Sequence, residues 1–80
     1  MEKIVIVEDD EILRDELSRL LRSSGYEIAI VTDFKNSKEE IVNLNPDLIL
    51  MDINIPYLNG EALLKSLRDD NKNIPVIMLT

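Results

Sequence analysis

Residues 47–60 read DLILMDINIPYLNG, in which four consecutive apolar residues lead directly into the carboxylate of Asp52. A short continuous apolar run is typical of a strand that is buried on both faces of a parallel sheet. A second run of this kind occupies residues 4–10, IVIVEDD, and ends in Glu8, Asp9 and Asp10. The two stretches therefore predict two buried strands that each present acidic side chains where the strand ends.

The hydrophobic pattern alternates between strand and helix along the whole chain. Strands are expected at Ile4–Val7, Tyr26–Val31, Leu48–Met51 and Pro75–Leu79. Helices are expected at Asp10–Ser24, at Ser37–Leu44 before the break at residues 45–47, and at Glu61–Arg68. This strict alternation with short connections predicts an α/β fold with a parallel sheet. Right-handed crossovers then place helices on both faces of that sheet.

Local signals mark the helix boundaries. Gly25 lies where a C-cap glycine belongs, and Ser37 and Glu40 have capping-box spacing. Asp9 or Asp10 could also serve simply as the N-cap of the first helix, so a structural role for one of them stays open. The apolar faces of the first and third helices are expected to comprise Leu13, Leu17, Leu20 and Leu21, and Leu63, Leu64 and Leu67.

Composition narrows the classes of function. The 80 residues include 16 acids and 9 bases, for a net charge of −7, and neither cysteine nor histidine. An acidic chain without a basic cluster is a poor candidate for direct contact with nucleic acid or an anionic membrane. Disulfides and thiolate or imidazole metal sites are excluded. No apolar run approaches the ~20 residues of a membrane span. We therefore expect a cytoplasmic protein of one domain or less, with a divalent cation or a basic protein surface as its partner.

The acidic strand ends predict a metal site. If the first and third strands are neighbours, their ends lie ~5 Å apart, and Glu8, Asp9 and Asp52 crowd one pocket. Carboxylates that close repel one another unless a cation lies among them. Magnesium is the usual hard cation where all ligands are oxygens and a phosphate is also bound.

On these residues the sequence resembles the receiver domains of bacterial two-component response regulators. VEDD, residues 7–10, is similar to the acidic pair of the family. LILMDINIPYLNG is similar to its phosphorylation signature, with Pro56 four and Gly60 eight residues after the aspartate, and PVIMLT to its fourth strand ending in Thr80. The resemblance runs through residues 1–80 and implies a flavodoxin-like (CheY-like) sheet in which the strands lie in the order second, first, third, fourth.

The resemblance also implies a role for each site residue. Asp52 would accept a phosphoryl group, and Thr80 would hydrogen-bond it. Asp9, Asp52 and the backbone carbonyl of Asn54 would bind Mg²⁺ directly, and Glu8 would bind it through a water. The implied partners are a sensor histidine kinase and, through an output domain outside this segment, DNA. The implied protein is a phosphoacceptor rather than an enzyme, with at most slow self-phosphorylation and dephosphorylation.

The sequence departs from the family in its extent. Residues 1–80 correspond to the first two thirds of a receiver, and the family's fourth helix, fifth strand and fifth helix do not follow, nor does the lysine that pairs with the phosphoryl group. We expect either a truncated chain or the ordered part of a longer regulator. Val76–Leu79 is then a sheet edge with apolar faces, which predicts weak stability, dimerisation or exchange of elements.

Two alternatives remain open. A magnesium-dependent phosphatase of the haloacid-dehalogenase type also uses a strand-end aspartate, but its motif requires a second acid two residues later, where this chain has Asn54. A receiver-like interaction module that is never phosphorylated is disfavoured by the intact acidic set, although the absent lysine keeps it open. A phosphate-binding P-loop is excluded, because the only glycines are Gly25 and Gly60.

Overall fold

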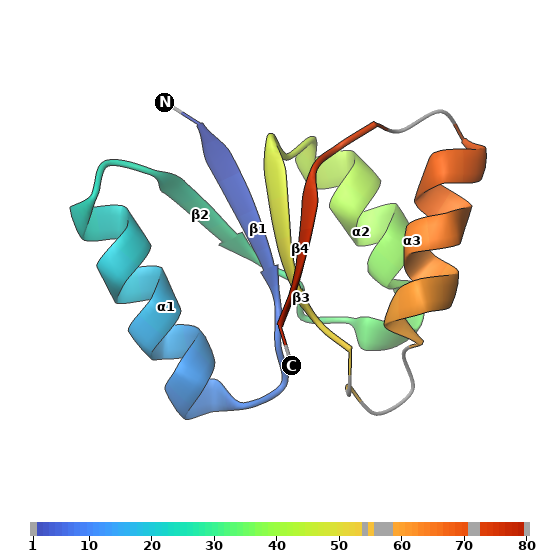
Figure 1. The fold of residues 1–80 in the computed structure, drawn as a ribbon. Helices are drawn as coiled ribbons and strands as arrows, with labels where there is room; N and C mark the ends of the chain where they lie inside the picture. The colour runs from blue at the N-terminus through green and yellow to red at the C-terminus, as the bar shows by residue number, and fades with distance from the viewer. Residues whose placement is uncertain (1, 54, 56–58, 71–72, 80) are drawn as a thin grey trace.

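The computed structural model describes residues 2–53, 55, 59–70 and 73–79. Its elements follow the chain in the predicted alternation of strand and helix (Figure 1). They are β1 (Lys3–Val7), α1 (Glu11–Ser23), β2 (Glu27–Ile30), the 3₁₀ turn η1 (Phe34–Asn36), α2 (Ser37–Leu44), β3 (Leu48–Asp52), α3 (Gly60–Asp69) and β4 (Val76–Leu79). None of the helices in the described residues is long and apolar enough to cross a membrane.

The four strands form one parallel sheet in the order β2-β1-β3-β4. Helix α1 covers one face of this sheet, and α2 and α3 cover the other (Figure 1). The predicted fold class, the strand order and the placement of helices on both faces are therefore confirmed. The carboxyl ends of β1 and β3, the two central strands, lie side by side, which is where open parallel sheets place their sites.

Burial on both faces of the central strands explains their continuous apolar sequence. Along β1, Val5 and Val7 belong to a core shared with α2 and α3, whereas Ile4 and Ile6 belong to a smaller core beneath α1. The same alternation continues in β3. The larger core comprises Val5, Val7, Val31, Ile41, Ile49, Met51, Ile55, Leu63 and Leu67. Each such side chain contributes about 1.5–3 kcal/mol when fully buried, so β1 and β3 form the rigid centre of the fold.

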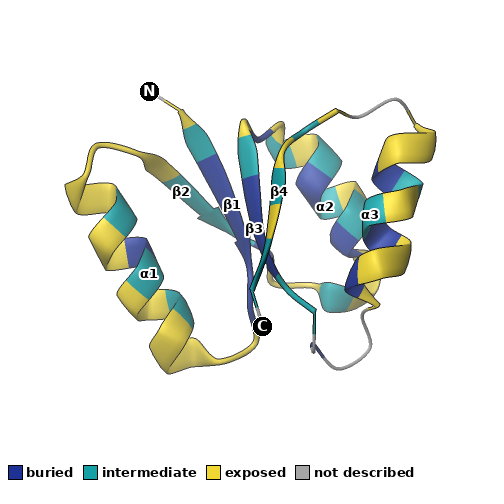
Figure 2. Ribbon diagram, in the orientation of Figure 1, coloured by how far each residue is buried: buried dark blue, intermediate teal, exposed yellow. Residues whose placement is uncertain are grey.

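The predicted apolar face of α1 is only partly buried. Leu17 and Leu21 pack against the core beneath the helix, but Leu13 and Leu20 are 42% and 62% exposed. The inward face of α1 runs through Leu17 and Leu21, and Leu13 and Leu20 lie on its flank, beyond the width of the contact with the sheet. Most of α1 is accordingly exposed (Figure 2).

The predicted capping box at the start of α2 is wrong. The 3₁₀ turn η1 leads directly into the helix, so the N-cap of α2 is Asn36 and not Ser37. The Asn36 side chain makes no capping hydrogen bond. The Glu40 carboxylate instead accepts hydrogen bonds from the backbone N–H groups of Thr32 and Asp33, at 3.1 and 3.0 Å. Glu40 therefore fastens the segment after β2 to α2, because these N–H groups have left the sheet and need an acceptor.

Candidate functional site

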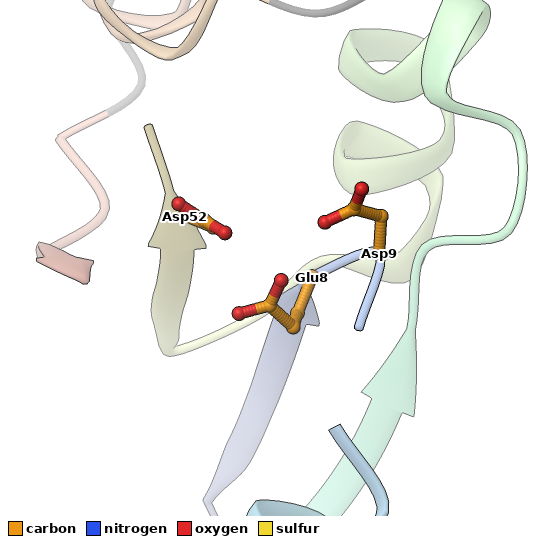
Figure 3. Close-up of side chains that lie close together, drawn as sticks. All are labelled: Glu8, Asp9 and Asp52. Atoms are coloured by element: carbon orange, nitrogen blue, oxygen red, sulfur yellow. The ribbon is translucent and has the colours of Figure 1, made fainter. Parts of the chain in front are cut away.

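The acidic site is built by the pairing of β1 with β3. Val7 is the register partner of Met51, so Glu8 and Asp52, the next residue of each segment, emerge at the same level of the sheet. Asp9 follows immediately on the β1 side. The carboxylates of Glu8, Asp9 and Asp52 point toward a common centre (Figure 3), and one oxygen from each lies within 4.8 Å of the others. The predicted meeting of these three carboxylates is present in the structure.

Burial across the site is graded. Glu8 is only 2% exposed, Asp52 is half-buried and Asp9 is exposed. Glu8 therefore forms the floor of the site, and Asp9 lies at its rim. A small ion or a phosphoryl group can approach from solvent, while the floor is fixed by the surrounding strands.

The two adjacent aspartates at the start of α1 have separate roles. The Asp10 carboxylate accepts hydrogen bonds from the backbone N–H groups of Ile12 and Leu13, at 3.0 and 3.2 Å, and is the N-cap of the helix. The capping alternative that the sequence left open thus falls on Asp10. Asp9 is left to turn its carboxylate toward Asp52.

Burial and the neighbouring carboxylates together raise the pKa of the Glu8 carboxyl above its usual value. Burial is the largest cause, and the hydrogen bond and charge of Asp52 add to it, with a smaller contribution from Asp9. The backbone N–H of Asp10 donates a hydrogen bond to Glu8 Oε2 at 3.2 Å and opposes the rise in pKa. A divalent cation relieves this repulsion, and an all-carboxylate donor set suits Mg²⁺ better than a soft transition metal. The residues at the site therefore fit the magnesium ion that the sequence predicts.

The described residues that follow Asp52 each have a defined contact. The Ile53 N–H donates to the carbonyl of Leu79, and Ile55 is 4% exposed in the larger core. At the start of α3, the Asn59 side chain caps the helix by accepting the N–H of Ala62 at 3.1 Å. The predicted site residues Asn54 and Thr80, and the loop residue Pro56, lie outside the described residues.

Close packing accounts for the glycine that follows this segment. A Cβ at Gly60 would lie 3.1 Å from Met78 Cε and 3.3 Å from Met51 Sδ. Gly60 itself is buried and is the first residue of α3. The absence of a side chain thus allows α3 to begin directly against β3 and β4, beside the site.

The family model for the response regulator receiver domain matches residues 4–80. The chain belongs to this family. The resemblance to receiver domains that the sequence indicates is therefore confirmed over nearly the whole chain.

Curated relatives of this receiver chain are bacterial regulators. Sensory transduction protein RegX3 of Mycobacterium tuberculosis is 39% identical over 80 residues, which are 100% of this chain and 35% of that protein. DNA-binding response regulator MtrA of Mycolicibacterium smegmatis is 34% identical over 79 residues, 99% of this chain and 34% of that protein. The chain thus spans about a third of the length of the curated relatives it matches.

Solved structures of similar receivers share the fold. The N-terminal domain of NsrR, a lantibiotic response regulator for nisin resistance, is 42% identical, with a TM-score of 0.88 over 98% of this chain and 65% of that one. TrrA of Thermotoga maritima, solved with Mg²⁺ and BeF, is 29% identical, with a TM-score of 0.89 over 100% of this chain and 70% of that one. TrrA solved in complex with the histidine kinase ThkA has a TM-score of 0.86 at 29% identity, over 100% of this chain and 69% of that one.

Proposed function

We propose that this receiver chain is the phosphoacceptor of a two-component system. In this proposal, Asp52 accepts a phosphoryl group from a sensor histidine kinase in the presence of Mg²⁺, and the change at Asp52 switches an output in transcription. The convergence of Glu8, Asp9 and Asp52 at the ends of two rigid strands is the observation that carries the proposal. The family supports it, as do TrrA, which was solved both with a histidine kinase and with Mg²⁺, and MtrA, whose name describes it as DNA-binding.

The proposed reaction is a direct transfer to a carboxylate oxygen. One Asp52 Oδ attacks phosphorus and forms a new O–P bond, while the P–N bond to the kinase histidine breaks and its electron pair returns to the imidazole nitrogen. Strand β3 holds the attacking oxygen in place, which matters because phosphoryl transfer depends chiefly on in-line positioning and charge neutralisation.

The cation would be held by residues of both segments. We assign Asp9, Asp52 and the backbone carbonyl of Asn54 as direct ligands, and Glu8 as a ligand through a water. When bound, Mg²⁺ supplies positive charge that neutralises the phosphoryl oxygens. Thr80 would then donate a hydrogen bond to one of those oxygens. The roles of Asn54 and Thr80 rest on the family pattern.

Phosphorylation changes the charge balance of the site. Asp52 carries one negative charge before transfer, and its phosphorylated form carries nearly two and has additional strong acceptor oxygens. The Glu8 carboxylate is buried and accepts a hydrogen bond from the Asp10 N–H, so it stays close to that charge. The shift must therefore be accommodated on the opposite side of Asp52, toward the segment after β3 and the end of β4, where a two-state change would begin.

The proposal also defines the extent of the module. Residues 1–80 correspond to the first two thirds of a receiver, and DNA binding belongs to an output domain outside them rather than to this acidic segment. Because histidine kinases draw phosphoryl groups from ATP, the module is assigned to the cytoplasm.

The proposed phosphoacceptor is not an enzyme, so each chain should be labelled once rather than turn over substrate. The edge of β4 is a candidate surface for a homodimer or for exchange of elements.

Intact mass spectrometry after incubation with acetyl phosphate and Mg²⁺ tests the central claim. We expect wild-type chain to gain the mass of one phosphoryl group and Asp52→Asn to gain none. Asp47→Asn is the matched control, because Asp47 directly precedes β3, at the opposite end of that strand from Asp52, and its carboxylate accepts the Lys3 N–H at 2.8 Å. That variant should be labelled like wild type.

Each contrary result points to a different alternative. A mass gain that survives in Asp52→Asn would overturn the assignment of the phosphoacceptor. An unlabelled wild-type chain that still folds and binds Mg²⁺ would favour the unphosphorylated interaction module. Release of many equivalents of phosphate per chain would favour the phosphatase.

A further inference from the structure

We propose that Asp10 is a positioning residue for the metal site, which it serves by holding the Glu8 carboxylate toward Asp9 and Asp52. This inference rests on the proposed function and deepens it. It assigns to the third acid of VEDD a task that is distinct from ligation and that links the start of α1 to the floor of the site.

Asp10 makes hydrogen bonds in two directions. Toward the helix, its Oδ1 accepts the N–H groups of Ile12 and Leu13, and its carbonyl accepts the N–H of Arg14 at 2.9 Å. Toward the site, its backbone N–H donates to Glu8 Oε2 at 3.2 Å. The residue that starts the helix is therefore also the residue that holds the buried carboxylate.

The Glu8 carboxylate needs such a donor. Glu8 is 2% exposed, and its carboxylate lies among like charges, since Asp9 and Asp52 each place an oxygen within 4.8 Å of a Glu8 oxygen. Repulsion would turn its side chain out of the site if rotation were free. A backbone N–H aimed at Oε2 favours the inward orientation and offsets part of that repulsion.

The side chain of Asp10 matters because it fixes the direction of its own N–H. Every residue except proline has a backbone N–H, but the N-cap interaction holds residue 10 in the extended conformation observed here, with φ −77° and ψ 107°. Without a capping side chain the first turn of α1 frays, and the N–H of residue 10 loses its fixed aim. Metal affinity then falls, because binding must also order Glu8.

Three variants separate this role from charge and from general stability. Asp10→Asn keeps the cap and removes the charge, because asparagine caps helices about as well as aspartate. Asp10→Ala removes both the cap and the charge. Ile41→Val lowers stability by a similar amount in the core on the other face of the sheet, away from Glu8.

Two measurements on the chain follow these variants. Calorimetric titration with Mg²⁺, at a temperature where circular dichroism shows each variant folded, should give about tenfold weaker binding for Asp10→Ala, the factor that corresponds to loss of such a cap. Asp10→Asn should stay within about twofold of wild type, since the exposed charge that it removes is screened by salt. Ile41→Val should do the same, since it changes only the larger core. Without metal, the amide of residue 10 should exchange with solvent about tenfold faster in Asp10→Ala than in Asp10→Asn, after correction for intrinsic rates.

The outcomes distinguish this inference from the proposed function. Equal metal affinities and equal exchange rates for Asp10→Ala and Asp10→Asn would overturn the positioning role, as would effects in Asp10→Ala no larger than those in Ile41→Val. A wild-type chain that binds no Mg²⁺ would instead count against the proposed function. Amide exchange would then decide the positioning role alone, because it needs no metal.

Discussion

Val7 of β1 and Met51 of β3 are register partners in the parallel ladder, and the acidic site follows from that single pairing. In β1 and β3 successive side chains point to opposite, covered faces of the sheet. A shift of one residue in the pairing of these strands would turn the side chains of one core toward the other. The two apolar cores therefore fix the register, and the register fixes the distance between Glu8 and Asp52. The energy that holds three repelling carboxylates together comes from hydrophobic burial in the strands that precede them.

Magnesium should stabilise the folded chain against heat. The three carboxylates converge only in the folded state, so an ion that binds them shifts unfolding by mass action. At a concentration 100-fold above Kd the gain is about 2.7 kcal/mol, which for a domain of this size raises Tm by roughly 10–20 °C. Thermal unfolding followed by circular dichroism, with and without MgCl₂ at constant ionic strength, measures the shift.

Asp9→Asn provides the control for that prediction. The side chain keeps its size, and Asp10 still caps α1, but one carboxylate at the rim of the site is lost. The stabilisation by Mg²⁺ should fall by more than half in this variant. An undiminished shift would mean that the ion binds elsewhere on the acidic surface.

Glu8→Gln should stabilise the metal-free chain at neutral pH. Because the pKa of Glu8 is raised above 4.5 on folding, chiefly by burial, the folded chain binds this proton more tightly than the unfolded chain. Ionisation of Glu8 therefore costs stability as pH rises above 4.5 through the raised pKa, and costs nothing below 4.5. Urea unfolding without metal should show the variant more stable than wild type at pH 7, with the difference disappearing by about pH 4.

Magnesium should reverse this order at pH 7, because the variant lacks the carboxylate that we assign to the ion through a water. Urea unfolding repeated in saturating MgCl₂ checks the reversal. A variant that is less stable than wild type even without metal would show that the hydrogen bond from the Asp10 N–H outweighs both the burial of the Glu8 charge and the repulsion from Asp52 and Asp9.

Substitution of Gly60 should depend on the shape of the new side chain. In Gly60→Ala the added methyl group meets the mobile end of the Met78 side chain at 3.1 Å and Met51 Sδ at 3.3 Å, and both can move by a few tenths of an ångström. We expect a change within about 1 kcal/mol. Gly60→Val has less freedom to avoid these atoms and should cost about 1–3 kcal/mol. Urea unfolding of both variants tests this, and equal costs would mean that the two methionines cannot move.

The order of strands and helices and the meeting of their ends could be predicted from the sequence. Alternating apolar runs predict the order of strands and helices. The buried central strands match the prediction because a short, continuous apolar run such as Leu48–Met51 is typical of a strand covered on both faces of a parallel sheet. The meeting of Glu8 with Asp52 follows from the same reasoning, since the carboxyl ends of adjacent parallel strands share one edge. Element ends differ from the predicted ones by at most one residue, as with Asp52, which lies within β3.

Local polar contacts were harder to predict, because several acceptors compete for the same donors. Ser37 and Glu40 have the spacing of a capping box, yet Glu40 binds the N–H groups of Thr32 and Asp33, eight and seven residues away in sequence. The choice between Asp9 and Asp10 as helix cap depends on where the first turn begins, and neither the composition nor the periodicity of the segment fixes that point. The burial of Ile55 was not predicted from the sequence. The signal for it was that Ile55 is an apolar residue among polar and turn-forming neighbours.

The outer edge of β4 should cause concentration-dependent association of the chain. Within the described residues β4 pairs only with β3, and Ile77 on this strand is 50% exposed. Unpaired strand edges with apolar side chains pair readily with another copy, and an edge lysine opposes such pairing. Sedimentation velocity over a range of concentrations should show association for wild type and a monomer for Ile77→Lys. Ile12→Lys, on the exposed side of α1, should associate like wild type although Ile12 is 79% exposed. A cooperative, well-folded wild-type monomer at every concentration would show that the β4 edge is inert.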